Sequence, residues 1–136
     1  MGREPTVPSD LLVGIHVLVV EDNADARDLF RTILEYAGAL VTVTDGAEQA
    51  LRMCEQILPD AILTDIAMPE RDGFWLIAEL RRREAAGRRP IPAIAVTGQG
   101  HGTAGRYDAA GFVEVLRKPV DPWELCRVVE MHARRR

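Results

Sequence analysis

Five short apolar segments recur along the chain, and each is followed by a stretch in which apolar residues have helical spacing. Segments of this length that are apolar almost throughout are typical of strands buried on both faces, as in parallel sheets. Between them, apolar residues stand three and four positions apart, which predicts amphipathic helices. The predicted strands cover residues 16–20, 40–44, 61–64, 93–96 and 113–116.

Polar residues that can cap a helix stand where most of these helices should begin. Asn23 can cap the first helix, and Asp45 followed by Glu48 has the spacing of a capping box for the second. Asp72 precedes a third helix that should run to about residue 86. Asp121 opens the last helix, with a proline and a second capping box behind it.

The fourth helix lacks such a signal, because the segment from residue 98 to residue 111 is rich in glycine. Each glycine inside a helix costs roughly 1 kcal/mol relative to alanine. We therefore expect one short helix near residues 103–110, loosely held against the rest of the domain.

The alternation of strand and helix, repeated five times, predicts an α/β fold with a doubly wound, five-stranded parallel sheet. Right-handed crossovers favour the strand order 2-1-3-4-5 of a flavodoxin-like (βα)5 fold. Residues 13–133 should form this single domain, with a flexible N-terminal tail at residues 1–12 and a C-terminal tail at 134–136. In such a sheet, ligands bind outside the carboxyl ends of the strands.

Composition and charge narrow the possible functions. A chain of 136 residues suffices for one domain with a real core, and its net charge of -4 shows no basic excess that would suggest nucleic acid binding. No apolar run approaches the ~20 residues of a membrane span, and no secretory signal is visible. Cys54 and Cys126 match no metal spacing and are interpreted as buried free thiols. We expect a cytoplasmic protein that binds neither nucleic acid nor membrane.

Five polar residues follow four of the predicted strands and should meet at one rim of the sheet. They are Glu21, Asp22, Asp65, Thr97 and Lys118. Lys118 is the only lysine in a chain that otherwise uses arginine. Lysine is a slim, mobile point charge, whereas arginine is a broad planar fork, so this choice indicates a specific role at the rim.

Three crowded carboxylates repel one another and resist ionisation, and a divalent cation relieves that repulsion. An all-oxygen donor set without Cys or His favours magnesium over zinc. Magnesium also neutralises phosphoryl oxygens, and an aspartate can accept a phosphoryl group as an acyl phosphate. We therefore predict Asp65 as the acceptor, Glu21 and Asp22 as metal holders, and Thr97 and Lys118 as phosphate ligands.

Four motifs in the chain together resemble the receiver domain of two-component response regulators. They are VLVVED at residues 17–22, LTDIAMPERDG at 63–73, AVTG at 95–98 and LRKPV at 116–120. The resemblance covers residues 16–131 and is specific, because four separate motifs occur in the right order at plausible spacing. It implies phosphorelay signalling, in which a histidine kinase or a histidine phosphotransfer protein donates a phosphoryl group from a phosphohistidine to Asp65.

The resemblance also implies roles for the other rim residues, with Mg²⁺ as the cofactor. Asp22 would ligate the metal directly together with Asp65, and Glu21 would do so through water. The backbone carbonyl of Ala67 would complete the protein ligands. Thr97 would swing toward the phosphoryl group and Lys118 would pair with it. The bond between Lys118 and Pro119 would be cis.

Two departures from the family pattern affect these expectations. Receivers often carry an aromatic residue three positions before the lysine, whose inward turn reports phosphorylation, and Val115 stands there. The positions two residues after the acceptor and two after the threonine tune the lifetime of the acyl phosphate, and they are Ala67 and Gln99. We also expect the loop at residues 98–105 to be mobile without phosphate.

Two other functions compete with a phosphoacceptor. A phosphohydrolase with Asp65 as nucleophile commonly needs a second acid two residues later, where Ala67 stands, so we expect no enzyme activity of this kind. A phosphorylation-independent interaction module with a receiver fold remains an alternative because of Val115. The chain is expected to be a stand-alone regulator or the receiver piece of a larger protein such as a hybrid kinase. Its downstream target, which the sequence leaves unknown, would bind the fourth helix, fifth strand and fifth helix.

Overall fold

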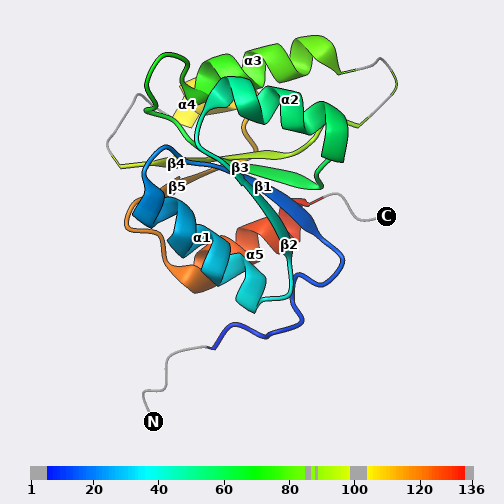
Figure 1. Ribbon diagram of the computed structural model, residues 1–136, viewed down its shortest axis with the longest axis vertical. Coiled ribbons are helices and arrows are strands. Elements are labelled where there is room, and N and C mark those ends of the chain that lie inside the picture. Colours follow the sequence, from blue (N-terminus) through cyan, green and yellow to red (C-terminus); the bar gives the residue numbers. More distant parts are fainter. Residues whose placement is uncertain (1–5, 85–86, 88, 99–103, 134–136) are drawn as a thin grey trace.

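Strands and helices alternate along the whole domain, in the order that the sequence predicts (Figure 1). We analysed a computed structural model, which describes residues 6–84, 87, 89–98 and 104–133. The elements are β1 His16–Val20, α1 Ala24–Tyr36, β2 Leu40–Thr44, α2 Ala47–Ile57, β3 Ala61–Asp65, α3 Gly73–Arg83, β4 Ala93–Thr97, α4 Ala104–Ala110, β5 Glu114–Arg117 and α5 Pro122–His132. No helix in the described part of the chain is long and apolar enough to cross a membrane.

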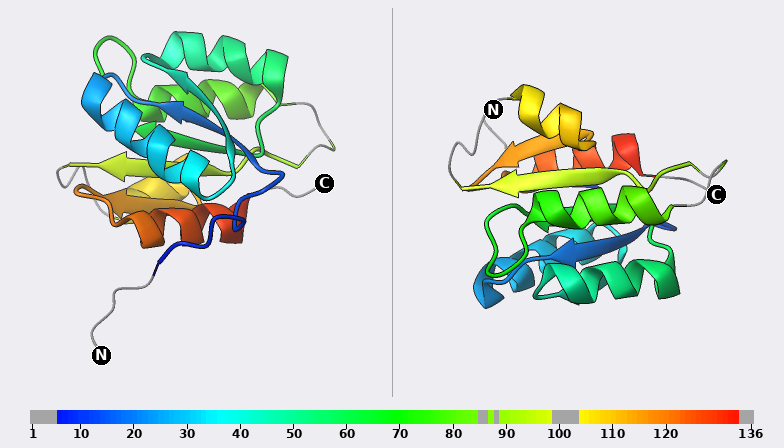
Figure 2. Two further views of the ribbon diagram at one scale, coloured as in Figure 1. Left: turned by 60° about the horizontal axis from the view of Figure 1, so that its bottom comes forward. Right: turned by 90° about the horizontal axis from the view of Figure 1, so that it is seen from above.

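The strands form one parallel sheet in the order β2-β1-β3-β4-β5, which confirms the predicted doubly wound topology. Seen from above, α4 lies at the β5 end of the sheet and α2 at the opposite end (Figure 2). The order places β1 and β3 side by side, with Val20 paired to Thr64. The residues that follow these two strands therefore emerge next to each other.

Helices cover both faces of the sheet, α1 and α5 on one side and α2, α3 and α4 on the other (Figure 1). The side chains of β1 alternate between the two faces. Leu18 and Val20 pack in the core under α2 and α3, whereas Val17 and Val19 pack in the core under α1 and α5. Burial on both faces explains why the strand sequences are apolar almost throughout.

Side-chain caps fix the starts of three helices as predicted. The side-chain oxygens of Asn23, Asp72 and Asp121 accept hydrogen bonds from backbone amides in the first turns of α1, α3 and α5, at 2.9, 2.8 and 2.9 Å. Each cap of this kind typically stabilises a helix by about 1 kcal/mol.

The start of α2 differs from the prediction. The capping residue is Gly46, which makes no side-chain capping bond, and Asp45 lies outside the helix. The capping box of Asp45 and Glu48 is therefore wrong. The helix begins one residue later than the box requires, and glycine is itself an accepted N-cap residue.

The end of α3 also differs, since the helix stops at Arg83 and Glu84 leaves it with extended backbone angles. The Glu84 carboxylate turns back and accepts hydrogen bonds from Arg81 and from the amide of Ile91. These bonds compete with continuation of the helix toward residue 86. The short helix α4 agrees with the predicted range, apart from Thr103, which lies outside the described residues.

The segment before β1 was expected to be a flexible tail, but the part of it nearest β1 packs against the domain. Leu12 is completely buried in the core under α1 and α5, and its amide donates to the carbonyl of Ala37 at 2.8 Å. Val7 packs against the same core. Leu12, which we had assigned to the tail, therefore belongs to the folded domain.

Candidate functional site

The structure brings the five predicted rim residues to the carboxyl ends of the strands. Asp65 and Thr97 are the last residues of β3 and β4, and Glu21 and Lys118 directly follow β1 and β5. Glu21 and Thr97 are each 1% exposed and Asp65 is 8% exposed, whereas Asp22 faces solvent. The rim thus holds two buried carboxylates beside one that water and a ligand can reach.

Lys118 joins the two buried carboxylates. Its Nζ lies 2.8 Å from Oε1 of Glu21 and 3.7 Å from Oδ2 of Asp65. Its first partner is thus Glu21, and its contact with Asp65 is longer than a hydrogen bond. One ammonium group faces three carboxylates, so the site keeps an excess of negative charge.

The side-chain oxygens of Glu21, Asp22 and Asp65 form a compact donor set. One oxygen from each lies within 4.8 Å of the others. Three carboxylates at this spacing fit a small, hard divalent cation, because they are all oxygen donors and one of them is open to water. Magnesium binds with one or two carboxylates and keeps several waters, which agrees with this half-open arrangement.

The acid–base properties of the site follow from its burial and its charge imbalance. Burial raises the pKa of Glu21, and the nearby Asp65 charge adds to this, although bonds from Lys118 and the Asn23 amide oppose it. Burial would lower the pKa of Lys118, but the carboxylates of Glu21, Asp65 and Asp22 together raise it. Lys118 is therefore a cation at neutral pH, and any added positive charge near Glu21 would favour its ionised form.

The loop between β1 and α1 is held in place by the first turn of the helix. The amide of Asn23 donates to Oε2 of Glu21 at 3.2 Å, and Nη1 of Arg27 donates to the backbone carbonyl of Glu21 at 3.0 Å. On the other side, the amide of Glu21 donates to the carbonyl of Thr44 at 3.1 Å. Arg27 was not predicted as part of the site, although it stands one turn inside the helix that follows the acidic pair.

Gly73 was also missed, although it lies directly behind the candidate acceptor. A Cβ atom at this position would come within 2.7 Å of the carbonyl oxygen of Asp65. The amide of Gly73 also donates to the carbonyl of Ile66 at 3.0 Å. A side chain here would push α3 away from the backbone of Asp65, so this contact requires glycine.

The ends of β4 and β5 are tied together behind the site. The amide of Lys118 donates to the carbonyl of Thr97 at 2.8 Å, and the bond between Lys118 and Pro119 is cis, as expected. Ala67, expected to offer its carbonyl to a metal, is exposed two residues beyond Asp65. Gln99 and most of the loop expected to be mobile lie outside the described residues.

Comparison with known proteins agrees with this geometry. The family model for the response regulator receiver domain matches residues 17–130. The chain is 45% identical over 123 residues to an uncharacterized 14.6 kDa protein of Leptolyngbya boryana, covering 89% of this chain and 92% of that protein. It is 35% identical over 125 residues to a sensor histidine kinase of Pseudomonas aeruginosa, covering 91% of this chain and 12% of the kinase. It spans less than half the length of that kinase and of other curated relatives.

A solved structure shows a comparable fold with metal bound. The receiver domain of another sensor histidine kinase of Pseudomonas aeruginosa, with a magnesium ion coordinated in its active site cleft, is 32% identical to this chain. The two superpose with a TM-score of 0.77, covering 88% of this chain and 98% of that one.

Proposed function

Because this chain belongs to the family of response regulator receiver domains, which act in two-component signalling, we propose that it is a phosphoacceptor and that Asp65 receives the phosphoryl group. The observation that carries the proposal is the composition of the rim. Three carboxylates lie within 4.8 Å of one another and share one lysine, which contacts Asp65 at 3.7 Å. A purely structural ion pair has no use for two additional negative charges.

In the proposed reaction, a carboxylate oxygen of Asp65 forms a bond to the phosphorus of a phosphohistidine on a histidine kinase or phosphotransfer protein. The phosphorus–nitrogen bond breaks, its electron pair stays on the imidazole, and an acyl phosphate remains on Asp65. Asp65 is nearly buried but sits at an edge where Asp22 is open to solvent. A phosphoryl group can therefore reach it from outside the sheet.

Magnesium fits the donor set of Glu21, Asp22 and Asp65. We propose the backbone carbonyl of Ala67 as a further ligand. When bound, magnesium supplies positive charge that offsets repulsion between these carboxylates and an incoming phosphoryl group. Glu21, the most buried of the acids, is held by Lys118 and the Asn23 amide. We propose that Glu21 holds Lys118 beside Asp65 and does not itself react.

Lys118 and Thr97 would bind the added oxygens. Lys118 lies between Glu21 and Asp65. A phosphoryl group on Asp65 would offer it a more strongly charged partner than the present carboxylate oxygen at 3.7 Å. Thr97 ends the neighbouring strand β4, and we propose that its hydroxyl donates to a phosphoryl oxygen. We propose no catalytic turnover, since the chain offers no acid two residues after Asp65.

Intact mass spectrometry after incubation with acetyl phosphate tests the proposal. Wild type should gain one phosphoryl group in the presence of Mg²⁺ and none in EDTA, and Asp65→Asn should gain none. Asp10→Asn, which removes an exposed carboxylate that precedes the amino end of β1, is the matched control and should label like wild type. Equal labelling of Asp65→Asn would overturn the assignment. A wild type that stays unlabelled by acetyl phosphate and by a phosphorylated histidine phosphotransfer protein would favour a phosphorylation-independent interaction module, which the small Val115 side chain on β5 also suits.

A further inference from the structure

A buried hydroxyl on α4 has no hydrogen-bond partner among the residues that the structure describes. Tyr107 is 3% exposed, yet its Oη neither donates to nor accepts from any of them. A buried polar group without a partner is unfavourable, and natural proteins keep very few of them. The hydroxyl therefore calls for a function that phenylalanine could not supply.

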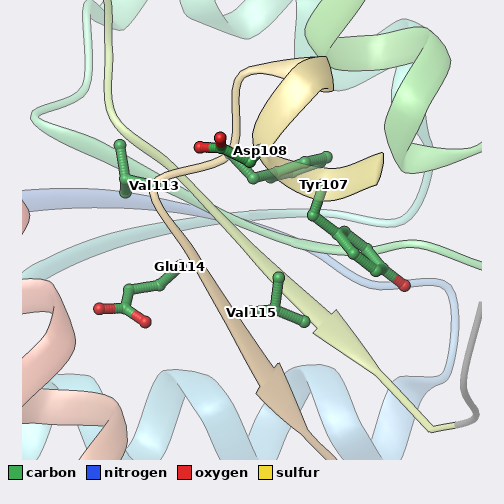
Figure 3. Close-up of a pocket in the computed structure, with 6 residues that line it drawn as sticks. Tyr107, Asp108, Val113, Glu114 and Val115 are labelled. Atoms are coloured by element: carbon green, nitrogen blue, oxygen red, sulfur yellow. The ribbon is translucent and has the colours of Figure 1, made fainter. Parts of the chain in front are cut away.

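The ring of Tyr107 is held by other aromatic rings, and these contacts leave its hydroxyl end unengaged. Its centroid lies 5.2 Å from that of Phe74 on α3 and 6.0 Å from that of Phe112 before β5. Arg106 stacks over the outer face of Phe74 at 4.1 Å. In Figure 3 the hydroxyl of Tyr107 points away from Asp108 and Val113.

A cavity beside this ring gives it room to change position. Its volume is about 290 Å³, and it opens between α4 and β5. Val115, half-buried on β5, fills less of this space than a larger residue would. The residues that line the cavity are Tyr107, Asp108, Phe112, Val113, Glu114 and Val115 (Figure 3).

Two short connections join Tyr107 to the phosphoacceptor site. Gly73 lies so close to the backbone of Asp65 that a Cβ atom on it would come within 2.7 Å of the Asp65 carbonyl oxygen, and the ring of the next residue, Phe74, packs against Tyr107. On the other side, Val115 lies on β5, and Lys118, which contacts Asp65, directly follows that strand. A displacement of Lys118 or of the backbone at Asp65 therefore reaches the aromatic ring through neighbouring residues on either path.

We propose that Tyr107 links the phosphorylation state of Asp65 to the position of α4, because its hydroxyl gains a hydrogen bond only when a phosphoryl group occupies the site. The unmodified domain carries the cost of the unpaired hydroxyl, and the phosphorylated domain is relieved of it. The difference biases the conformational equilibrium toward the second state, since only interactions that differ between two states can shift their populations. The inference rests on the proposed phosphoacceptor function.

Tyr107→Phe tests this proposal, because it removes the hydroxyl and leaves the ring. The melting temperature is measured for each protein with and without Mg²⁺ and beryllofluoride, a stable mimic of the phosphoryl group. Without the mimic, Tyr107→Phe should melt roughly 2–4 °C above wild type. Its apparent affinity for beryllofluoride should be roughly three- to tenfold weaker, as expected for the loss of one neutral hydrogen bond. Tyr36→Phe, which removes an exposed hydroxyl, is the matched control and should match wild type in both measurements.

The outcomes separate this inference from the proposed function. If beryllofluoride does not stabilise wild type, or stabilises Asp65→Asn equally, the phosphoacceptor function fails and the inference fails with it. If wild type responds and Tyr107→Phe has the same affinity, only the role of Tyr107 is overturned. A lower melting temperature for unmodified Tyr107→Phe would also overturn it, because it would show that the hydroxyl already has a partner.

A second measurement needs no variant at position 107. The chain has two tyrosines, so wild type labelled with ¹³C at the tyrosine ζ carbon gives two signals, and Tyr36→Phe assigns them. Adding Mg²⁺ and beryllofluoride should shift the Tyr107 signal and leave that of Tyr36 in place. A Tyr107 signal that stays unchanged while the Asp65 site is saturated would overturn the proposal.

Discussion

Two clusters of charged residues lie at opposite ends of the sheet, and they are built differently. At the carboxyl ends of the strands, Lys118 faces Glu21, Asp22 and Asp65. At the amino ends, Nη1 of Arg81 lies 3.0 Å from both carboxylate oxygens of Glu84. The first cluster has three acids for one cation, whereas the second has one acid for one cation.

The Arg81 cluster is also closed by the backbone. Nη2 of Arg81 donates to the carbonyl of Ile91 at 2.8 Å, and Oε2 of Glu84 accepts from the amide of Ile91 at the same distance. The one positive charge of Arg81 is matched by the one negative charge of Glu84, and both side chains also bond to the backbone of Ile91. The cluster therefore joins the end of α3 to the start of β4 and does not need a ligand. Imbalance of charge, rather than burial alone, thus distinguishes the candidate functional site from a structural ion pair. The two cations differ in the same way. Arg81, with its planar guanidinium, holds the structural ion pair, whereas Lys118, with its flexible ammonium, lies at the candidate site.

The largest expected effect comes from neutralising one acid in each cluster. Asp65→Asn should weaken Mg²⁺ binding by roughly 100-fold or more, since losing even outer partners of a metal ligand commonly costs 10- to 100-fold. It should also leave the metal-free domain at least as stable, because the repulsion between Asp65 and Glu21 disappears. Glu84→Gln should lower stability and leave Mg²⁺ affinity unchanged. Titration calorimetry measures the Mg²⁺ affinity of the two variants, and thermal melts measure their stability. A loss of Mg²⁺ affinity in Glu84→Gln would contradict the purely structural role of the Arg81 cluster.

Removing the cation from the Arg81 cluster should produce the next largest effect, a decrease in the unfolding free energy. Arg81→Met leaves the half-buried Glu84 carboxylate without its counter-charge and the Ile91 carbonyl without a donor, which should cost about 2–3 kcal/mol of unfolding free energy. Arg82→Met is the control, because its ion pair with Glu79 is exposed to solvent and should contribute little to stability. Urea denaturation measures the unfolding free energy of both variants. An equal decrease in the two would show that the Arg81 cluster does not stabilise the fold more than an exposed ion pair does.

A smaller effect is expected from Arg27, which holds the acidic loop without touching a carboxylate. Arg27→Met should weaken Mg²⁺ binding by roughly three- to tenfold through loss of the bond to the Glu21 carbonyl. Arg27→Lys should restore part of this affinity. Arg31→Met, which removes an exposed arginine one turn later, should bind Mg²⁺ like wild type. If Arg27→Met and Arg31→Met have the same affinity, Arg27 does not position the loop.

Much of this comparison could be predicted from the sequence, and its limits have physical causes. Strand ends locate Glu21, Asp65 and Lys118, because in a parallel sheet all carboxyl ends share one edge. The role of Glu84 could not be seen, since it depends on a bond to Ile91 across a turn. Gly73 looked like an ordinary helix start until the backbone of Asp65 was found against it. Contacts between segments thus escaped an analysis that read each segment separately.

The smallest expected effect concerns the two buried thiols, Cys54 and Cys126. Burial, with contributions from Glu84 and Glu55, raises the pKa of Cys54 from 9.0 to about 12, and burial raises that of Cys126 from 9.0 to about 11. Both thiols stay neutral in the folded state, which confirms the expected buried free cysteines. The unfolded chain loses these protons first, so the stabilisation is complete below pH ~9 and is lost as the pH rises toward the folded values.

Denaturation in urea at pH 8 and pH 10 measures this dependence. Each thiol should contribute about 1 kcal/mol to the loss of unfolding free energy between these pH values. Cys126→Ala should lose less on going to pH 10 than wild type, whatever its stability at pH 8. An equal loss in the two proteins would show that Cys126 titrates normally in the folded state.

The most direct test of the central claim is to locate the phosphoryl group chemically. Borohydride reduces an aspartyl phosphate to homoserine, and peptide mass spectrometry then identifies the converted residue. After incubation with acetyl phosphate and Mg²⁺, the account predicts homoserine at position 65 and unchanged acids at Glu21 and Asp22. Conversion at Asp22 or at any other acid, with Asp65 intact, would contradict it.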